Sequence, residues 1–324
     1  MPQSSADAPN GILLVDKPQG LTSHDVVART RKKADTRKVG HAGTLDPMAT
    51  GLLILGLGSS TRLLTYIVGL DKEYEATIRL GVSTTTDDAD GESLGTAPAT
   101  QVQRVTEAAI LEAIGPLTGN IEQVPSSVSA IKVDGRRAYA LVRAGQEVQL
   151  KARAVTVKEF DVTRVRATTD TNGDPVIDVD VRVVCTSGTY IRALARDLGF
   201  KLGVGGHLTA LRRTRIGGFH VSDALTIDDV ASPPTLIGPA DVARRVFPFV
   251  ELALESAVDL SHGKKVTLEG YPDTTEPVAA IGPEDRLVGL IAVKAGLSRV
   301  ILNFPAYGPT ALGDDTEPLE APTA

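Results

Sequence analysis

Gly43-Thr44-Leu45-Asp46-Pro47-Met48-Ala49-Thr50-Gly51 is a short stretch bounded by glycines, and it holds one carboxylate next to a buried apolar run. Pro47 disfavours helical backbone for the residue before it, so we expect Asp46 to be extended, with its side chain projecting from a loop. The apolar residues 52–57 (LLILGL) predict a buried strand that anchors this loop. Asp46 is therefore our candidate for chemistry, although an isolated Asp-Pro pair more often caps a turn.

The composition is that of a globular protein. The 324 residues are 42% apolar and 23% charged, which suffices for one large core and a smaller domain. No segment approaches the roughly 18 consecutive apolar residues that a membrane helix needs. The first ten residues lack the basic start and apolar core of a signal peptide, so we expect a cytoplasmic protein.

Metal and nucleotide cofactors are not indicated. Cys185 is the only cysteine and lies in an alternating stretch, so we expect a buried structural thiol rather than a nucleophile. The five histidines show no ligand spacing, and the chain has neither a Walker loop nor a dinucleotide-binding glycine fingerprint. We therefore expect no metal and no cofactor.

The charge is distributed unevenly. The net charge is −6, yet residues 28–41 hold six basic side chains and one acidic side chain. A basic surface on an otherwise acidic protein suits a phosphate backbone, which favours a nucleic-acid partner. A solvated helix face is the alternative interpretation of such a cluster.

Periodicity and end signals predict a mixture of helices and strands. The expected strands are residues 11–15, 52–57, 73–80 and 177–184. The expected helices are residues 23–33, 59–69, 105–114, 136–143 and 190–202. Because these elements do not alternate regularly, we expect an α+β fold around a mixed sheet.

The pattern changes near Phe247. A short helix at 250–260 and short strands at 264–268, 278–281, 286–293 and 299–302 predict a small β-rich module. Residues from about 307 onward are acidic and rich in proline, which is typical of a disordered tail.

The string from His41 to Leu53 closely resembles the catalytic motif of the TruB family of tRNA pseudouridine synthases. Other segments recur in the family's order, and together they cover roughly residues 10–230. They are 11–20 (GILLVDKPQG), 72–74 (KEY), 88–91 (DADG), 123–125 (QVP), 187–192 (SGTYIR) and 211–213 (LRR).

The resemblance implies the pseudouridine synthase fold, with a central mixed, largely antiparallel sheet and a small PUA-like RNA-binding domain at the C-terminal end. It implies this organisation: a flexible tail at 1–9, a catalytic domain at 10–245 with an RNA-clasping insertion at 121–148, a PUA-like domain at 246–306 and an acidic tail at 307–324.

The resemblance also implies roles for three residues in turning uridine into pseudouridine. Asp46 would be the nucleophile, acting on either C1′ of the sugar or C6 of the base. Arg192 would pair with Asp46, and we expect this cation to reverse the rise in the pKa of Asp46 that burial causes. Tyr74 would stack on the target base and assist proton transfer.

Further residues would bind RNA. The expected substrate is tRNA, modified at uridine 55 of the T loop by a monomeric enzyme. His41 would fill the space that the flipped nucleotides leave, Leu211 would line the pocket and Lys17, next to Pro18, would support the site. The insertion would close over the RNA with its three arginines, Arg136, Arg137 and Arg143.

Two other functions remain open on the residues alone. One is a non-catalytic protein that binds or folds RNA and has kept the fold. The other is a nucleoside glycosidase that uses Asp46, although typical glycosidases have two carboxylates and the matching motifs show no second one.

Overall fold

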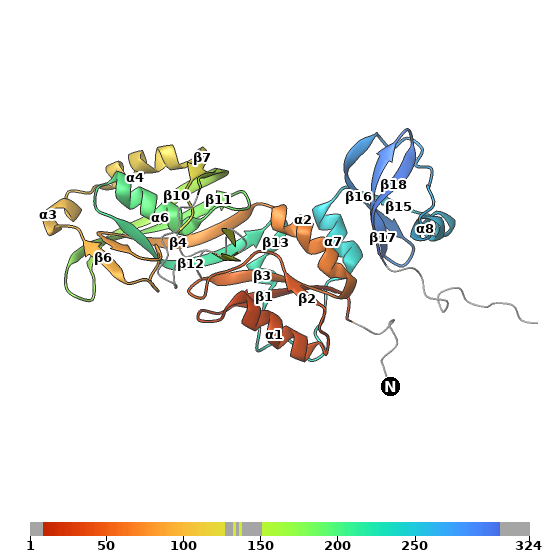
Figure 1. Cartoon of the computed structure of the whole chain (residues 1–324), viewed down its shortest axis with the longest axis horizontal. Helices are drawn as coiled ribbons and strands as arrows, with labels where there is room; N and C mark the ends of the chain where they lie inside the picture. Colours follow the sequence, from red (N-terminus) through yellow and green to blue (C-terminus); the bar gives the residue numbers. More distant parts are fainter. Residues whose placement is uncertain (1–8, 127–131, 134–135, 138–150, 305–324) are drawn as a thin grey trace, which may run out of the picture. The chain divides into compact units, whose positions relative to one another are not determined.

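The computed structural model describes residues 9–126, 132–133, 136–137 and 151–304 (Figure 1). The chain divides into two compact units. The larger unit comprises residues 13–56 and 61–235, and the smaller unit comprises residues 1–12, 57–60 and 236–324. Apart from Pro9, the expected N-terminal tail lies outside the described residues, as does the expected acidic tail.

A ten-stranded sheet forms the centre of the larger unit. Its order is β14 (Leu225–Thr226), β1 (Gly11–Lys17), β3 (Thr50–Leu57), β12 (Gly206–Ile216), β4 (Lys72–Leu80), β11 (Pro175–Cys185), β10 (Arg153–Thr169) and β7 (Gly119–Gln123), with β13 (Phe219–His220) on β12 and β2 (Val39–His41) on β3. Pairs β1–β14 and β3–β12 are parallel, whereas β4, β10 and β11 pair antiparallel with their neighbours. The predicted α+β fold around a mixed, largely antiparallel sheet is confirmed.

Strand β4 has two different faces. Tyr74, Ile78 and Leu80 are buried in the main core, where α6 (Ile191–Lys201) adds Leu194 and Leu198. Helices α3 (Ala99–Val102) and α4 (Glu107–Ile114) add further apolar side chains to this core. The alternation predicted for this strand therefore separates a core face from a polar face.

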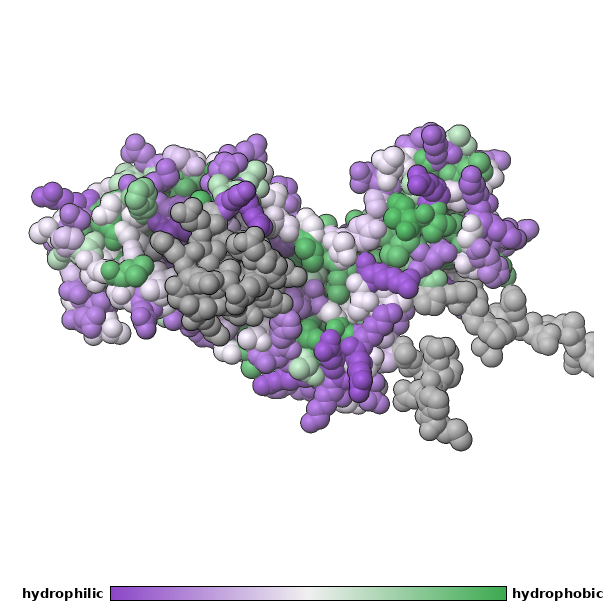
Figure 2. All heavy atoms as spheres, in the orientation of Figure 1, coloured by the Kyte–Doolittle hydropathy of each residue, from purple (hydrophilic) through white to green (hydrophobic). Residues whose placement is uncertain are grey.

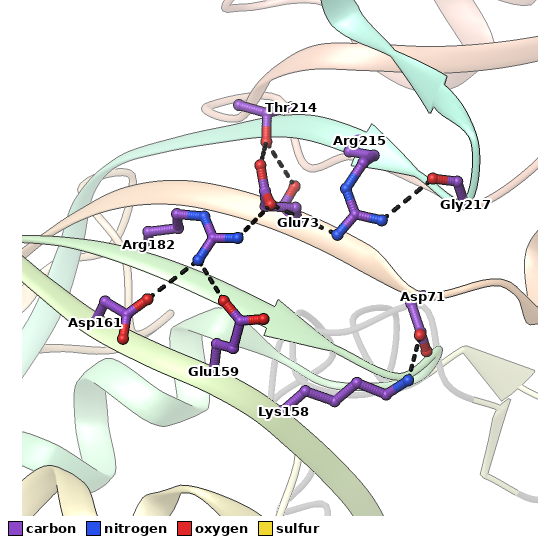
Figure 3. Close-up of polar contacts among 9 residues, drawn as sticks. All are labelled: Asp71, Glu73, Lys158, Glu159, Asp161, Arg182, Thr214, Arg215 and Gly217. Carbon is purple, nitrogen blue, oxygen red and sulfur yellow. Dashed lines mark hydrogen bonds and ion pairs between the residues drawn. The ribbon is translucent and has the colours of Figure 1, made fainter.

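The polar face carries a network of ion pairs (Figure 3). Arg182 on β11 lies 2.8 Å from Glu73 on β4 and 3.1 Å from Asp161 on β10. Arg215 on β12 lies 3.5 Å from the same Glu73. Cations on this face are thus paired with carboxylates across neighbouring strands.

Helix α1 (Ser23–Lys33) begins where the sequence predicts. Thr22 is its N-cap, and a capping box with Asp25 satisfies the first backbone N–H groups. On one face of the helix Val26 and Val27 are buried, whereas Arg31 and Lys32 in its last turn are exposed. The helix therefore presents a basic surface to solvent.

Two predicted helices of the larger unit differ from the structure. Residues 59–69 are helical in two parts, a 3-10 helix at Gly58–Leu63 followed by α2 at Leu64–Gly69. The predicted helix at 136–143 is wrong at its start, because β9 (Arg136–Arg137) pairs with β8 (Lys132–Val133). The Asp134-Gly135 dipeptide between these strands is a hairpin signal, which outweighs the helical periodicity there.

The smaller unit contains a four-stranded sheet in the order β15 (Phe249–Glu251), β16 (Thr274–Gly282), β17 (Arg286–Lys294) and β18 (Leu297–Asn303). Helices α7 (Pro239–Val246) and α8 (Leu254–Ser261) accompany it, and Leu260, Ala280 and Ile291 are in its core. The predicted small β-rich module is confirmed.

Two details of the smaller unit correct the prediction. The first residues of the predicted helix at 250–260 belong to β15, whose exposed and half-buried side chains gave no clear strand pattern. The predicted strand at 264–268 is wrong, because only Thr267 forms an isolated bridge, with Leu297. Among the described residues, no helix is long and apolar enough to cross a membrane.

Candidate active site

The loop that carries Asp46 connects β2 to β3 and is fixed at its base. The Ser23 hydroxyl accepts a hydrogen bond from Leu45 N at 2.9 Å and donates one to Leu45 O at 3.2 Å. This places the start of α1 directly behind the residue before Asp46. The Asp46 side chain remains 37% exposed, so the loop presents its carboxylate to a solvent-accessible space.

That space is a cavity of about 250 Å³ in the larger unit. Its lining includes Asp46 from the loop, Tyr74 from β4, Arg192 from the first turn of α6 and Leu211 from β12. Four residues named from the sequence therefore meet at one cavity, although 165 positions separate the first from the last.

Arg192 is held between two carboxylates. Its Nε lies 3.1 Å from Oδ2 of Asp46, and its Nη1 lies 3.2 Å from Oδ2 of Asp88. The Nη1 group also donates a hydrogen bond to Thr86 O at 2.9 Å. Only 6% of the Arg192 side chain is exposed, so these contacts fix the direction in which the guanidinium faces Asp46.

Asp88 is a site residue to which the sequence reasoning gave no role. It is 3% exposed, and its Oδ1 accepts hydrogen bonds from the Thr86 hydroxyl at 2.5 Å and from Asp90 N at 3.1 Å. These bonds anchor the carboxylate that holds Arg192. Its place in the recognised segment 88–91 was the available signal, but the sequence did not show which cation it would meet.

Burial raises the pKa of Asp46 above its ordinary value. The Arg192 charge lowers the pKa, and the nearby Asp88 carboxylate raises it. The expectation that the cation would reverse the effect of burial is therefore wrong, because desolvation is the larger influence. Arg192 opposes the rise without cancelling it.

Tyr74 and Leu211 form the apolar part of the cavity. Tyr74 is 9% exposed, and burial raises the pKa of its hydroxyl while the positive charge of Arg213 opposes that rise. Leu211 is 8% exposed and faces Ala76 in the register of β12 and β4. An aromatic ring and an aliphatic side chain thus line the same cavity as the carboxylate, and an aromatic ring is suited to stacking on a planar base.

Lys17 lies beneath the loop and is fully buried. Its Nζ donates hydrogen bonds to Leu21 O at 2.7 Å, Pro18 O at 3.0 Å and Pro47 O at 3.3 Å. Burial lowers the pKa of Lys17 to about 8, against the opposing effect of the Asp46 charge. Its hydrogen bonds join the end of β1 to the residue after Asp46.

The remaining candidates lie elsewhere. His41 is in β2, before the loop, and its ring meets that of His24 edge-on at 5.7 Å. Burial lowers the pKa of His41. Arg136 and Arg137 are described only as backbone in β9, and Arg143 lies outside the described residues.

Cys185 is buried, and burial raises the pKa of its thiol to about 11, which fits the expected structural role. Across the described ranges, no group of three or more His, Cys, Asp or Glu residues is arranged to hold a metal ion.

Two protein-family models match this chain, one after the other along the sequence. Residues 31–191 match the model of the TruB family pseudouridylate synthase N-terminal domain, and residues 192–236 match that of the tRNA pseudouridylate synthase B C-terminal domain. Similar proteins named tRNA pseudouridine synthase B include one from Leifsonia xyli, 58% identical over 92% of this chain and 97% of the relative. Another, from Mycobacterium leprae, is 48% identical over 94% of this chain and 93% of the relative.

Solved structures agree in fold. A chain in the crystal structure of a Cbf5-Nop10-Gar1 complex is 25% identical, with a TM-score of 0.68 over 94% of this chain and 88% of that chain. A chain of an H/ACA RNP bound to a substrate RNA that contains 2′-deoxyuridine is 24% identical, with a TM-score of 0.66 over 91% of this chain and 84% of that chain. The expected pseudouridine synthase fold is confirmed, and the chain belongs to the TruB family of pseudouridylate synthases.

Proposed function

We propose that the protein is a tRNA pseudouridine synthase that isomerises uridine 55 of the T loop, with Asp46 as the nucleophile. The observation that carries the proposal is the Asp46 carboxylate, 3.1 Å from Arg192 in a cavity that Tyr74 also lines. Relatives named tRNA pseudouridine synthase B, up to 58% identical among those compared, support the substrate.

In this proposal the target uridine leaves the RNA stack and enters the cavity, at a cost of a few kcal/mol. The ionised Asp46 attacks C1′ of the sugar or C6 of the base, and the N1–C1′ bond breaks. The base turns and C5 bonds to C1′. N1 gains a proton, C5 loses one, and Asp46 is released, so the product has the mass of the substrate.

Arg192 and Tyr74 have separate tasks in this sequence. Arg192 lowers the pKa of Asp46 against the effect of burial, which keeps more of the carboxylate in its reactive form. The Tyr74 ring supports the base by stacking. Its hydroxyl, whose pKa burial raises, is protonated at neutral pH and suits a proton-transfer partner.

The RNA backbone is proposed to approach over α1. Hydrophilic side chains make up much of the surface around this helix in Figure 2. Four basic side chains of the helix and of the residues just after it are exposed, namely Arg31, Lys32, Arg37 and Lys38. The Ser23 hydrogen bonds tie the same helix to the Asp46 loop. Positive side chains on the helix that supports the Asp46 loop suit the phosphates of a bound RNA.

Other parts of the proposal concern the remaining sequence. His41 fills the space of the flipped nucleotides, Leu211 lines the pocket and Lys17 supports the loop. The insertion at 121–148, with Arg136, Arg137 and Arg143, and a PUA-like domain at 246–306 bind the T arm and the rest of the tRNA. We take the enzyme to be a cytoplasmic monomer.

The test uses an unmodified T-arm transcript and the purified full-length chain. Carbodiimide labelling followed by primer extension should give one stop, at position 55, with wild type. Asp46→Asn should give no stop while binding the transcript with unchanged affinity. No stop with wild type would contradict the enzyme and favour a non-catalytic RNA-binding protein.

The same reaction mixture also tests the glycosidase alternative. Chromatography of the small molecules should find no free uracil, because an isomerase retains the base. Stoichiometric uracil release would show that the chain hydrolyses the glycosidic bond instead.

A further inference from the structure

Arg213 on β12 is a buried cation that also lines the cavity. It is 1% exposed, and among the described residues no carboxylate forms an ion pair with it. Its Nε donates a hydrogen bond to Leu52 O at 2.8 Å, its Nη2 donates one to Gly43 O at 3.0 Å and its Nη1 approaches Thr44 O at 3.5 Å. The guanidinium thus donates to three backbone carbonyls, and it also contacts the Tyr74 hydroxyl, whose pKa it lowers against the effect of burial.

These carbonyls belong to the two sides of the Asp46 loop. Gly43 and Thr44 precede Asp46, whereas Leu52 follows it within the buried part of β3. Arg213 itself is paired with Gly51 of β3 and with Tyr74 of β4. The Arg213 side chain therefore connects both arms of the Asp46 loop, residues 43–44 before Asp46 and residue 52 after it, to β12, the strand that pairs with β4.

The neighbouring arginine provides a contrast. Arg212 points to the opposite face of β12, where it is 37% exposed and paired with Asp16 at 2.7 and 3.0 Å. A buried arginine without a carboxylate is costly unless its donors are well placed. Arg213 is buried without a carboxylate, and its donors reach the loop. Arg212 avoids this desolvation cost, because it is partly exposed and paired with Asp16.

We infer that Arg213 is a positioning residue for the reaction: its guanidinium sets the shape of the Asp46 loop and hence the place of the carboxylate relative to Tyr74. This inference rests on the proposed function and adds a residue to it. Arg213 can act through the loop, because it donates hydrogen bonds to the backbone of residues 43, 44 and 52.

The guanidinium geometry matters for this role. Three donor nitrogens in one rigid plane reach carbonyls on both arms at once, whereas a lysine ammonium is a single point on a flexible stem. Arg213→Lys keeps the charge but cannot hold both arms, so it should impair positioning. Arg213→Ala removes the group and leaves a space that free guanidinium fits.

The experiment measures single-turnover kinetics on the T-arm transcript for wild type, Arg213→Lys, Arg213→Ala and the matched control Arg212→Met. We expect the rate of the chemical step to fall about 100-fold in both Arg213 variants, as for a displacement of about 1 Å. RNA affinity should change little, and millimolar guanidinium should restore part of the rate in Arg213→Ala only. Arg212→Met should react like wild type.

Circular dichroism and thermal melts identify variants that fail to fold, and Arg213→Lys remains informative if Arg213→Ala does not fold. A wild-type rate in Arg213→Lys, or a loss confined to RNA affinity, would overturn the inference. If the wild-type chain forms no pseudouridine at all, the proposed function fails instead.

Discussion

Arg192 and Asp46 form an ion pair at 3.1 Å, and Asp88 holds the other side of the same guanidinium at 3.2 Å. The two carboxylates have different surroundings, since the Asp46 side chain is 37% exposed and that of Asp88 is 5% exposed. Asp88 is therefore placed to orient the arginine, and Asp46 to meet a substrate.

Removing the acceptor that orients Arg192 should slow the reaction. In Asp88→Asn the side chain keeps its size but loses the charge that holds Nη1. We expect the rate of the chemical step to fall about 10- to 100-fold, because a guanidinium that shifts by about 1 Å no longer supports Asp46. Single-turnover assays measure this, with Asp241→Asn as the control that keeps the wild-type rate, because the Asp241 side chain on α7 is 60% exposed.

The pH dependence of the chemical step should report the ionisation of Asp46. Burial raises the pKa of Asp46, so the rate should increase with pH through a midpoint above the ordinary 3.8. Asp88→Asn should move this midpoint to lower pH, because the Asp88 charge raises the pKa of Asp46. Arg192→Met should move it to higher pH. An identical midpoint in all three proteins would contradict the assignment to Asp46.

The raised pKa of Asp46 also affects the stability of the fold. The folded state binds the Asp46 proton more tightly than the unfolded state, so the free energy of unfolding falls as pH rises from about 3.8 through the raised pKa. At pH 7 Asp46→Asn should therefore melt at a higher temperature than wild type. Below both pKa values the difference should vanish, and melts across this range check it. A lower melting temperature at pH 7 would show that the ion pair outweighs desolvation.

Gly51 should not tolerate a side chain. Its φ is +100°, and a Cβ there would lie 2.3 Å from the carbonyl oxygen of Arg213. Gly51→Ala should lower the free energy of unfolding by at least about 1–3 kcal/mol. Gly69→Ala is the control, because Gly69 lies in α2 with open space around it. Urea unfolding measures both, and equal effects would contradict this role of Gly51.

The network in Figure 3 should matter little for activity. Arg182 is 36% exposed and lies on the polar face of the sheet. Exposed ion pairs contribute about 0–1 kcal/mol each, so Arg182→Met should lower the free energy of unfolding by about 1 kcal/mol. Turnover should equal that of wild type. Loss of turnover in a folded Arg182→Met protein would show that this face takes part in the reaction.

Local signals predicted α1 from its cap, β3 from its continuous apolar run and β4 from its regular alternation. Strand β12 gave no such pattern, since the buried Arg213 occupies a position where an apolar residue is expected. The resemblance named Asp46, Tyr74, Arg192 and Leu211, which the fold brings to one cavity. The sequence could not assign the partners of Asp88 and Arg213, because elements far away in the chain supply them.

The most direct test of Asp46 as the reacting group follows the proton at C5 of the target uridine. A T-arm transcript carrying tritium at C5 should release it to water when C5 bonds to C1′. We predict release by wild type and a rate at least about 1,000-fold lower with Asp46→Asn, at unchanged RNA affinity. Release by Asp46→Asn at the wild-type rate would contradict the account.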